Sequence, residues 1–391
     1  MRAFILLMIC FATTSFAQHE ELQTGASRLA IAPGSSPVEL SSKRIGLVVN
    51  QSSLVGDTHL LELLLQQGLQ VNKIFSPEHG FRGTADAGAK VDNSIDPDTG
   101  VAVLSLYGKS KKPTAEALQD IELLIFDLQD VGVRYYTYLS TLHYVMEAAA
   151  EQNIPLLVLD RPNPNGTYVD GPVLEKNYQS FVGLHPIPLL HGMTLGELAL
   201  MIKGESWIHK AEQLKLYVLP IKNYQRHMPY ELPVRPSPNL PNAQAVALYP
   251  SLGFFEATPL SIGRGTDFPF QVLGHTNPPL GSFAFSPVSK AGAALNPPLK
   301  NQLVLGLDLR EVKAGGLDLS YLIQAQRLFA KHNLKLFNSP DFMDKLSGTS
   351  KLRQQIEQGW TETQIRQSWQ SELIKFRQQR QPYLLYPDHQ L

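Results

Sequence analysis

The sequence has almost no cysteine: its single cysteine, Cys10, lies within the first 17 residues. These residues have the pattern of a secretory signal peptide (1–17), with Arg2 before an apolar stretch and a small-x-small cleavage site that ends at Ala17. The apolar stretch is too short to span a membrane as a helix. Cleavage there would leave a chain without thiols, so we expect neither disulfides nor thiolate catalysis or ligation.

We therefore expect an exported, periplasmic protein that has no stable membrane insertion after signal cleavage. Lipid anchoring through Cys10 is the alternative. It is disfavoured because Ile9 precedes the cysteine at a position where a small residue is usual.

The chain also lacks an excess of charge and the short motifs of several enzyme classes. Its formal net charge of −1 gives no basis for binding nucleic acid. No H-E-x-x-H, H-x-H or C-x-x-C pattern indicates zinc, and no G-x-S-x-G or S-x-x-K pattern indicates a serine acyl-enzyme. No Walker A loop is present and no G-x-G-x-x-G follows an apolar run. We expect no cofactor and no metal.

Apolar runs typical of buried strands alternate with helical patterns in the first half of the chain. The runs lie at 45–49, 71–75, 101–106, 123–126, 156–159 and 214–219, and the helical patterns at 57–67, 114–119, 136–153 and 194–203. This alternation indicates a parallel sheet covered on both faces. We predict an α/β fold with a doubly wound parallel sheet over residues 41–232, after a flexible lead-in at 18–40.

Residues 233–391 are predicted to form a second, smaller α/β domain that closes a cleft against the first. The stretch 233–300 holds many of the 28 prolines. We interpret it as ordered, extended loop because proline disfavours regular helix and central strand. A strand at 303–309 and helices near 318–331 and 361–370 follow.

Polar side chains gather after four of the apolar runs. Ligands of parallel α/β sheets bind outside the carboxyl ends of the strands, so we expect these groups to meet in one site. They are Asn50 and Gln51; Glu78, His79 and Arg82; Asp127, Gln129, Asp130, Arg134, Tyr135, Tyr136 and Tyr138; and Asp160, Arg161, Asn163 and Asn165.

A structural role is the alternative for several of these residues. Asp160 and Asn165 could cap the helices that follow them. Asp127 could hold a backbone turn, and Asp130 could form an ion pair with Arg134.

Glu78 is harder to explain structurally, because Pro77 fixes its approach and no clear helix follows for it to cap. His79 could act in catalysis or orient its neighbours. A further polar group lies at 254–270, where Glu256, Arg264 and Asp267 stand among glycines and prolines. Rigid polar loops of this kind are often functional, and a lock between domains is the alternative.

His191 precedes a capping box at Thr194, and it either faces the cleft or serves as a capping or core histidine. Carboxylates, amides, arginines and aromatic rings together suit a polyhydroxylated ligand such as a sugar. Glycoside cleavage needs one carboxylic acid, with either a second carboxylate or an internal nucleophile. A metal-dependent hydrolase built from Asp127, Asp160 and His79 stays open as an alternative.

Six blocks of sequence, in order, resemble the exo-β-N-acetylmuramidases of the NamZ/YbbC-like family. They are G-L-V-V-N-Q-S-S, F-S-P-E-H-G-F-R-G, F-D-L-Q-D-V-G-V-R-Y-Y-T-Y, V-L-D-R-P-N-P, H-G-M-T-L-G-E-L-A and S-I-G-R-G-T-D-F-P-F. The resemblance runs from about residue 41 to the C-terminus. It implies a Rossmann-like domain, a C-terminal α/β domain and a site in the cleft between them.

The resemblance also implies an exo-acting glycoside hydrolase that releases N-acetylmuramic acid from the non-reducing end of peptidoglycan fragments. Glu78 matches the family's proposed catalytic glutamate, and we assign it as the general acid. The second group is either the substrate's 2-acetamido group or a carboxylate, for which the candidates are Asp127, Asp130, Glu256 and Asp267. Muramic acid carries a lactyl carboxylate, so we expect a cationic clamp from Arg82, Arg134 or Arg264.

We thus predict Glu78, His79 and Asp127 as catalytic residues and muramyl saccharides from peptidoglycan as partners. The predicted substrate-binding residues are Asn50, Arg82, Gln129, Asp130, Arg134, Tyr136, Asp160, Arg161, Asn163, His191, Glu256, Arg264 and Asp267. The rival functions are a metal-dependent amidase or deacetylase on cell-wall fragments and a periplasmic sugar-binding protein.

Overall fold

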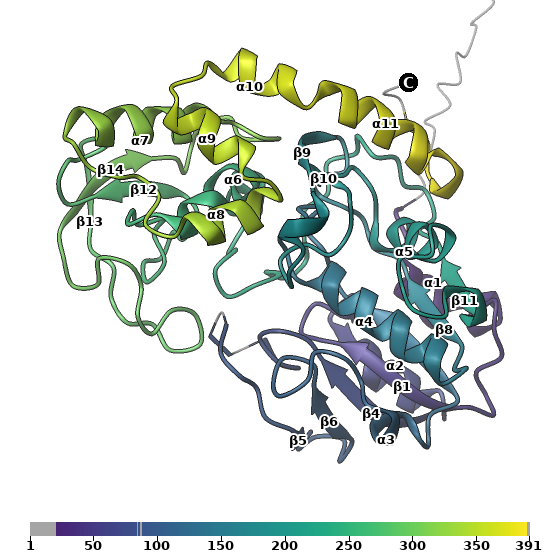
Figure 1. The fold of residues 1–391 in the computed structure, drawn as a ribbon. Helices are drawn as coiled ribbons and strands as arrows, with labels where there is room; N and C mark the ends of the chain where they lie inside the picture. Colours follow the sequence, from purple (N-terminus) through teal and green to yellow (C-terminus); the bar gives the residue numbers. More distant parts are fainter. Residues whose placement is uncertain (1–20, 84, 87, 389–391) are drawn as a thin grey trace, which may run out of the picture.

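The computed structural model describes residues 21–388 except 84 and 87, and the predicted signal peptide lies outside these residues. The described chain forms two lobes (Figure 1), one around a seven-stranded sheet and a smaller one around a three-stranded sheet. No helix in this part of the chain has the length and apolar character that crossing a membrane requires.

The central sheet has the strand order β11-β8-β7-β1-β4-β6-β5. Its parallel strands are β1 (Arg44–Val49), β4 (Gln70–Ser76), β6 (Ala102–Ser105), β7 (Leu123–Asp127), β8 (Leu156–Leu159) and β11 (Leu216–Leu219), and β5 (Ser94–Ile95) pairs antiparallel with β6. The parallel strands reverse their direction of progression between β1 and β7, as in a Rossmann fold. The predicted doubly wound parallel sheet is confirmed.

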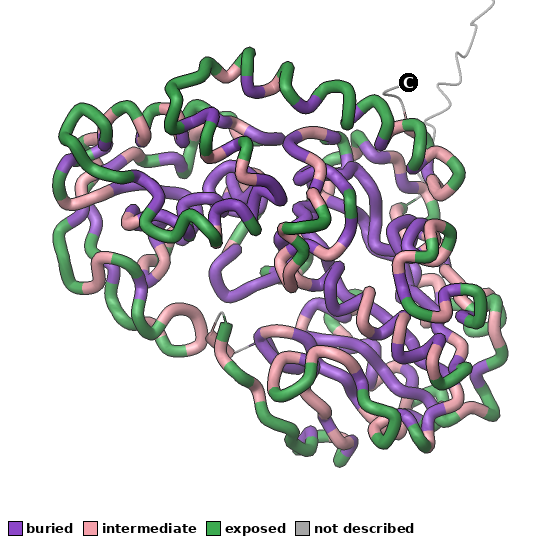
Figure 2. The backbone as a smooth tube through the Cα atoms, in the orientation of Figure 1, coloured by how far each residue is buried: buried purple, intermediate pink, exposed green. Residues whose placement is uncertain are grey.

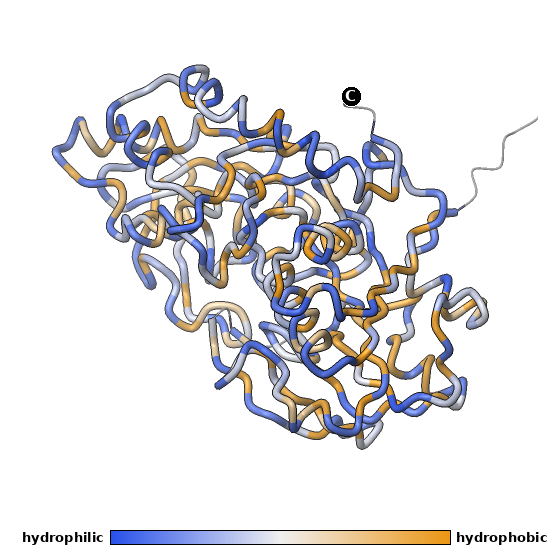
Figure 3. The backbone as a smooth tube through the Cα atoms, turned by 45° about the vertical axis from the view of Figure 1, so that its right-hand side comes forward, coloured by the Kyte–Doolittle hydropathy of each residue, from blue (hydrophilic) through white to orange (hydrophobic). Residues whose placement is uncertain are grey.

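Helices cover both faces of this sheet. The helices are α1 (Gly25–Ile31) and α2 (Leu60–Gln66) on one face, and α3 (Ala115–Leu118), α4 (Tyr138–Glu151) and α5 (Leu195–Gly204) on the other. Leu47 and Ile125 pack with the first pair of helices, whereas Val48 and Phe126 pack with the second group. The alternation follows from the strand period of two. It leaves the inner strands β1, β7 and β8 buried and apolar inside the lobe (Figures 2 and 3).

Part of the predicted flexible lead-in at 18–40 is the helix α1, and the first residues of that segment, 18–20, lie outside the described residues. Thr24 caps this helix through its side chain, and Ala26 and Leu29 are fully buried. The Gly25 N–H donates to the Asp160 carbonyl over 2.8 Å. A segment rich in Ser, Gly and Pro therefore folds onto the sheet, because two apolar side chains and a glycine make a close contact that composition does not reveal.

The second lobe contains the antiparallel sheet β12-β14-β13. Its strands are β12 (Val272–His275), β13 (Phe283–Phe285) and β14 (Val304–Asp308), and its helices are α6 (Ala243–Leu252), α7 (Ser320–Lys331), α8 (Pro340–Ser347) and α9 (Lys351–Glu357). The chain then returns to the first lobe through α10 (Glu362–Ser368) and α11 (Gln370–Arg380) (Figure 1). There α11 contacts β9 (Asp170–Val173), which pairs with β10 (Pro188–Leu190).

The prediction of extended loop throughout 233–300 is wrong, because α6, β12 and β13 lie within it. Prolines are absent from most of α6, and Pro250 lies in its last turns. Proline has no N–H to donate to the carbonyl four residues earlier. That carbonyl, of Val246, lies 3.5 Å from the Asn165 Nδ2, which donates in its place.

Candidate active site

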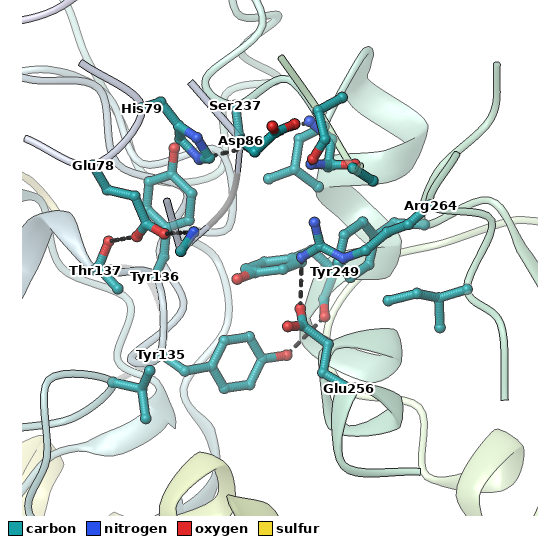
Figure 4. Close-up of a pocket in the computed structure, with 18 of the residues that line it drawn as sticks. Glu78, His79, Asp86, Tyr135, Tyr136, Thr137, Ser237, Tyr249, Glu256 and Arg264 are labelled. Carbon is teal, nitrogen blue, oxygen red and sulfur yellow. Dashed lines mark hydrogen bonds and ion pairs between the residues drawn. The ribbon is translucent and has the colours of Figure 1, made fainter. Parts of the chain in front are cut away.

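A cavity of about 750 Å³ lies between the two lobes, next to the end of β4. Its first-lobe wall comes from the segments after β4 and β6 and from the start of α4, and the second lobe supplies the opposite wall (Figure 4). Its lining includes Glu78, His79, Tyr107, Lys111, Tyr136, Thr137, Phe181, Ser237, Glu256 and Arg264. This volume is within the usual range of small-molecule binding sites.

Glu78 enters this cavity from the turn that follows β4. The strand ends in a buried segment, and the Gly80 N–H then donates to the Pro77 carbonyl over 3.0 Å, which closes the turn. Gly80 has a φ of +77°, a conformation that glycine adopts without strain. The Thr137 hydroxyl donates to Glu78 Oε2 over 2.7 Å and the Gly88 N–H donates to Oε1 over 2.9 Å. Both carboxylate oxygens are thus oriented by the protein.

Two further side chains stand near Glu78, and both follow β6. Burial raises the pKa of Tyr107, and the Glu78 carboxylate adds to that rise through its charge and a hydrogen bond. Lys111 places its Nζ 3.4 Å from the centroid of the Phe181 ring and 4.8 Å from that of Tyr107. This wall therefore combines aromatic faces with a cation.

His79 joins the two lobes at the edge of the cavity. Its Nδ1 lies 2.9 Å from the Ala85 carbonyl, which can only accept, so Nδ1 carries the proton. Its Nε2 then accepts from the Ser237 hydroxyl at 3.2 Å. Burial lowers the pKa of His79, although the Glu78 carboxylate opposes that change. The ring is therefore neutral and fully engaged, which suits the orienting role better than proton transfer.

The second lobe contributes a carboxylate and a guanidinium held together. Arg264 Nη2 lies 3.0 Å from Glu256 Oε1 (Figure 4), and the guanidinium carbon lies 5.0 Å from the Phe270 ring centroid. Burial acts to lower the pKa of Arg264, but the neighbouring Glu256 outweighs it and the pKa stays above its ordinary value.

Tyrosine rings line the cavity between these two walls. The Tyr136 hydroxyl donates to the Pro236 carbonyl over 2.8 Å, and the Tyr135 hydroxyl donates to the Tyr249 carbonyl over 2.7 Å. Tyr136 packs edge-to-face against Tyr138, with ring centroids 4.8 Å apart. The hydroxyls of Tyr135 and Tyr136 are hydrogen-bonded to backbone carbonyls. These two side chains therefore offer a substrate mainly their aromatic surface.

The structure brings together only part of the predicted site. Glu78, His79, Tyr136, Glu256 and Arg264 line the cavity. The predicted residues that do not line it are Asn50, Arg82, Asp127, Gln129, Asp130, Arg134, Asp160, Arg161, Asn163, His191 and Asp267. Each of these eleven residues has other partners in the structure.

Asp127 and Arg161 form a buried, bidentate ion pair with distances of 2.5 and 2.8 Å. Asn50, at the end of β1, donates from Nδ2 to the Tyr138 hydroxyl over 2.7 Å. Asn50 and Asp127 end the two strands where the sheet order reverses, the place at which such sheets usually bind ligands. In this protein, side-chain hydrogen bonds and the ion pair occupy the point where the strand order reverses. The cavity lies next to that point, at the end of β4.

Asp160, Asn163 and His191 serve the backbone around α5. Asp160 accepts from the Thr194 hydroxyl over 2.7 Å and from the Gly196 N–H over 2.8 Å. Asn163 Nδ2 donates to the Met193 carbonyl, and His191 Nδ1 accepts from the Met193 N–H over 3.2 Å. Burial lowers the pKa of His191 to about 3, so it is a neutral core histidine.

Gln129, Asp130 and Arg134 are buried and do not line the cavity. Gln129 Nε2 donates to the Pro162 carbonyl over 2.8 Å. Asp130 and Arg134 do not form the ion pair considered above. Asp130 accepts from the Gly132 N–H over 2.6 Å, and burial raises its pKa to about 7.

Arg134 is a link between the lobes. It donates to carbonyls of the first lobe, at residues 172 and 187, and of the second lobe, at 346 and 347. Burial lowers its pKa to about 9. Both terminal nitrogens of its guanidinium are therefore committed to backbone carbonyls, and the side chain does not line the cavity where a clamp for substrate would act.

Arg82 and Asp267 lie at the surface outside the cavity. Arg82 pairs with Asp96 at 2.6 Å and with Asp98 at 2.8 Å. Asp267 is exposed and pairs with Lys290 at 2.5 Å.

The residues proposed for a metal-dependent alternative do not form one ligand set. Asp127, Asp160 and His79 are each held by the separate partners given above. Within residues 21–388, apart from 84 and 87, no three or more His, Cys, Asp or Glu side chains are placed to hold a metal ion.

Sequence reasoning missed Tyr107 and Lys111, which the same strand-end rule could have found after the apolar run at 101–106. It also missed Thr137, Phe181 and Ser237. No local pattern marks these three, because they reach the cavity through tertiary packing.

Comparison with known proteins gives matches along nearly the whole chain. Residues 45–244 match the profile described as "Exo-beta-N-acetylmuramidase NamZ, N-terminal" and residues 247–386 match the corresponding C-terminal profile. A peptidoglycan β-N-acetylmuramidase NamZ of Bacillus subtilis strain 168 is 40% identical over 375 residues, which cover 89% of this chain and 88% of that protein.

Two crystal structures of DUF1343 family proteins from Bacteroides fragilis NCTC 9343 have the same fold. The first is 43% identical, with a TM-score of 0.84 over 94% of this chain and 100% of that chain. The second is 29% identical, with a TM-score of 0.79 over 94% of this chain and 99% of that chain.

Proposed function

The chain belongs to the exo-β-N-acetylmuramidase NamZ family, and on that premise we propose that Glu78 is the general acid of the reaction. The reaction is the release of N-acetylmuramic acid from the non-reducing end of peptidoglycan fragments. One observation carries the assignment: Glu78 is the carboxyl group on the first-lobe wall whose two oxygens are both oriented by hydrogen bonds inside the cavity.

In this reaction the bond between the anomeric carbon and the bridging oxygen breaks. Glu78 gives its proton to the bridging oxygen, which leaves as the hydroxyl of the next sugar. Water supplies the oxygen that ends on the anomeric carbon, and its proton restores Glu78. The Gly88 N–H can only donate, so the oxygen that it contacts, Oε1, acts as an acceptor and the transferable proton is carried on Oε2. The Thr137 hydroxyl beside Oε2 can rotate, so it can accept a hydrogen bond from the protonated oxygen or donate one to the ionised oxygen.

Two of the candidates that the sequence offered for the second group remain. Of the four carboxylates considered from the sequence, Glu256 lines the cavity, whereas Asp127, Asp130 and Asp267 do not. Glu256 faces the cavity opposite Glu78 and is held by Arg264 (Figure 4). The substrate's own 2-acetamido oxygen is the other candidate, and it needs no second carboxylate.

The rival functions lose their structural basis. The amidase or deacetylase alternative depended on Asp127, Asp160 and His79 acting together, and these residues have separate partners. A sugar-binding protein would use a cleft between lobes, but it has no need of a carboxyl group oriented as Glu78 is.

Export to the periplasm is part of the proposal. It is supported by the signal-peptide pattern at 1–17 and by a peptidoglycan substrate, which lies outside the cytoplasm. Cell fractionation with an antibody to the protein tests it, and a cytoplasmic location would contradict it.

The function is tested with a disaccharide that carries N-acetylmuramic acid at its non-reducing end. Mass spectrometry should detect free N-acetylmuramic acid with the wild-type protein. Glu78→Gln should lower turnover by about 10²- to 10⁴-fold, the usual contribution of a general acid, without lowering the melting temperature.

Glu116→Gln is the matched control, because Glu116 is an exposed residue of α3 that does not line the cavity. It should keep wild-type turnover. Undiminished release by Glu78→Gln would remove Glu78 from its role.

A further inference from the structure

One cation of the cavity, Lys111, has no carboxylate partner among the residues that the structure describes. Lys111 lines the cavity with Glu78, and no described residue forms an ion pair with it. Its Nζ lies over the Phe181 ring, 3.4 Å from the ring centroid, and 4.8 Å from the centroid of the Tyr107 ring. Burial lowers the pKa of Lys111, and the opposing effect of the Glu78 carboxylate is smaller. The carboxylate therefore only partly offsets the cost of burying the ammonium charge.

The other cations considered for the clamp are committed elsewhere. Arg264, the second basic residue of the cavity lining, is paired with Glu256. Arg82 and Arg134 do not reach the cavity. Lys112, the next residue in the chain, pairs with Glu147 and Glu151 at 2.7 Å each. Lys111 is therefore the basic side chain of the lining that is ready to receive an anion.

The aromatic rings around Lys111 hold its ammonium group at a defined position. Phe181 packs in parallel on Tyr144, with ring centroids 6.2 Å apart and an interplanar angle of 12°. Tyr107 also packs against Phe181, with ring centroids 5.7 Å apart and an interplanar angle of 54°. A lysine over such faces is held by cation–π attraction, and the reduced access of water strengthens its attraction for an anion.

We propose that Lys111 binds the lactyl carboxylate of N-acetylmuramic acid in the subsite beside Glu78. The inference rests on the proposed function, since that function supplies the sugar. The lactyl group is the part of N-acetylmuramic acid that N-acetylglucosamine lacks. Lys111 is thus a specificity-determining residue, and the rings of Tyr107 and Phe181 hold its ammonium group at the required position.

The test compares nitrophenyl β-glycosides of N-acetylmuramic acid and of its neutral lactyl carboxamide. Lys111→Met should lower kcat/KM for the acid by about 10- to 100-fold, the usual effect of losing a hydrogen bond to a charged group. It should leave kcat/KM for the carboxamide within about twofold of wild type, because that substrate offers no charge to the ammonium group. Lys111→Arg should recover part of the loss, and the control Lys112→Met should match wild type on both substrates.

Binding of free N-acetylmuramic acid, measured by calorimetry, separates this inference from the proposed function. Lys111→Met should weaken that binding and leave the binding of N-acetylglucosamine unchanged, whether or not any glycoside is cleaved. Cleavage of neither glycoside by the wild-type protein would instead contradict the proposed function. An equal loss on acid and carboxamide, or unchanged binding of the acid, would overturn the role of Lys111.

Discussion

Asp127 and Glu78 both stand at the carboxyl ends of strands in the central sheet, yet they have opposite environments. Asp127 is neutralised by the bidentate guanidinium of Arg161, 34 residues further along the chain. Glu78 receives a hydroxyl and a backbone N–H and faces the cavity. Sequence alone placed both at one edge of the sheet, but it could not show which carboxylate a distant cation would reach.

Asp130 gives a prediction about pH, because it is buried and its pKa is raised to about 7. In the unfolded chain this carboxyl loses its proton near pH 4, whereas the folded protein keeps the proton until about pH 7. The free energy of unfolding should therefore fall as pH rises across this interval, by up to about 1.4 kcal/mol per pH unit from this group. Asp130→Asn should remove that decline in urea unfolding at fixed ionic strength.

Asp98→Asn is the control, since Asp98 is exposed and pairs only at the surface with Arg82. Its stability should follow the wild-type pH profile. A difference between Asp130→Asn and wild type that stays constant from acid to neutral pH would argue against a protonated Asp130 in the folded state.

Elements of the first lobe were largely predictable, because buried parallel strands are near-continuous apolar runs. The run at 123–126 became β7, and the capping box at Thr194 opens α5 as predicted. The element α11 was missed because its sequence, Q-S-E-L-I-K-F-R-Q-Q-R, is mostly polar and places only a few side chains in the core. The element α1 was missed because its stability comes from contact with the sheet, not from its own composition.

The close packing of α1 on the sheet predicts that adding a side chain at Gly25 strongly lowers the stability of the fold. A Cβ there would lie 2.5 Å from the Asp160 nitrogen and 2.5 Å from the Leu219 carbonyl oxygen, both of which are backbone atoms. Gly25→Ala should therefore lower the free energy of unfolding by about 1–3 kcal/mol in urea denaturation, the usual range for overpacking. Gly34→Ala, where a Cβ would meet nothing within 4 Å, should change it by less than about 0.5 kcal/mol. Equal effects at the two glycines would contradict the close packing of α1.

At the scale of the whole molecule, the C-terminal segment returns from the second lobe and is bonded into the first (Figure 1). The Tyr386 hydroxyl donates to Asp160 Oδ2 over 2.6 Å and accepts from the Ile221 N–H over 2.9 Å. The Leu385 N–H donates to Glu197 Oε1 over 2.7 Å. These contacts join the end of the chain to the sheet edge and to α5, so the two lobes are linked there as well as at Arg134.

Tyr386→Phe should therefore destabilise the protein by about 1–3 kcal/mol, since it leaves a buried N–H without a partner. Burial raises the pKa of Asp160 to about 6, so the loss should be larger near pH 8, where Asp160 is ionised, than near pH 5. Thermal unfolding at both pH values measures it. Tyr383→Phe, whose hydroxyl donates to the more accessible Glu205, is the control, and a loss as large as that of Tyr386→Phe would contradict the account.

The general-acid role of Glu78 is tested most directly by how the effect of Glu78→Gln depends on the leaving group. A saccharide leaving group needs a proton, whereas a dinitrophenolate departs without one. The variant should therefore lose about 10²- to 10⁴-fold in kcat/KM on the disaccharide and far less on the dinitrophenyl glycoside of N-acetylmuramic acid. Equal losses on both substrates would show that Glu78 does not deliver the proton.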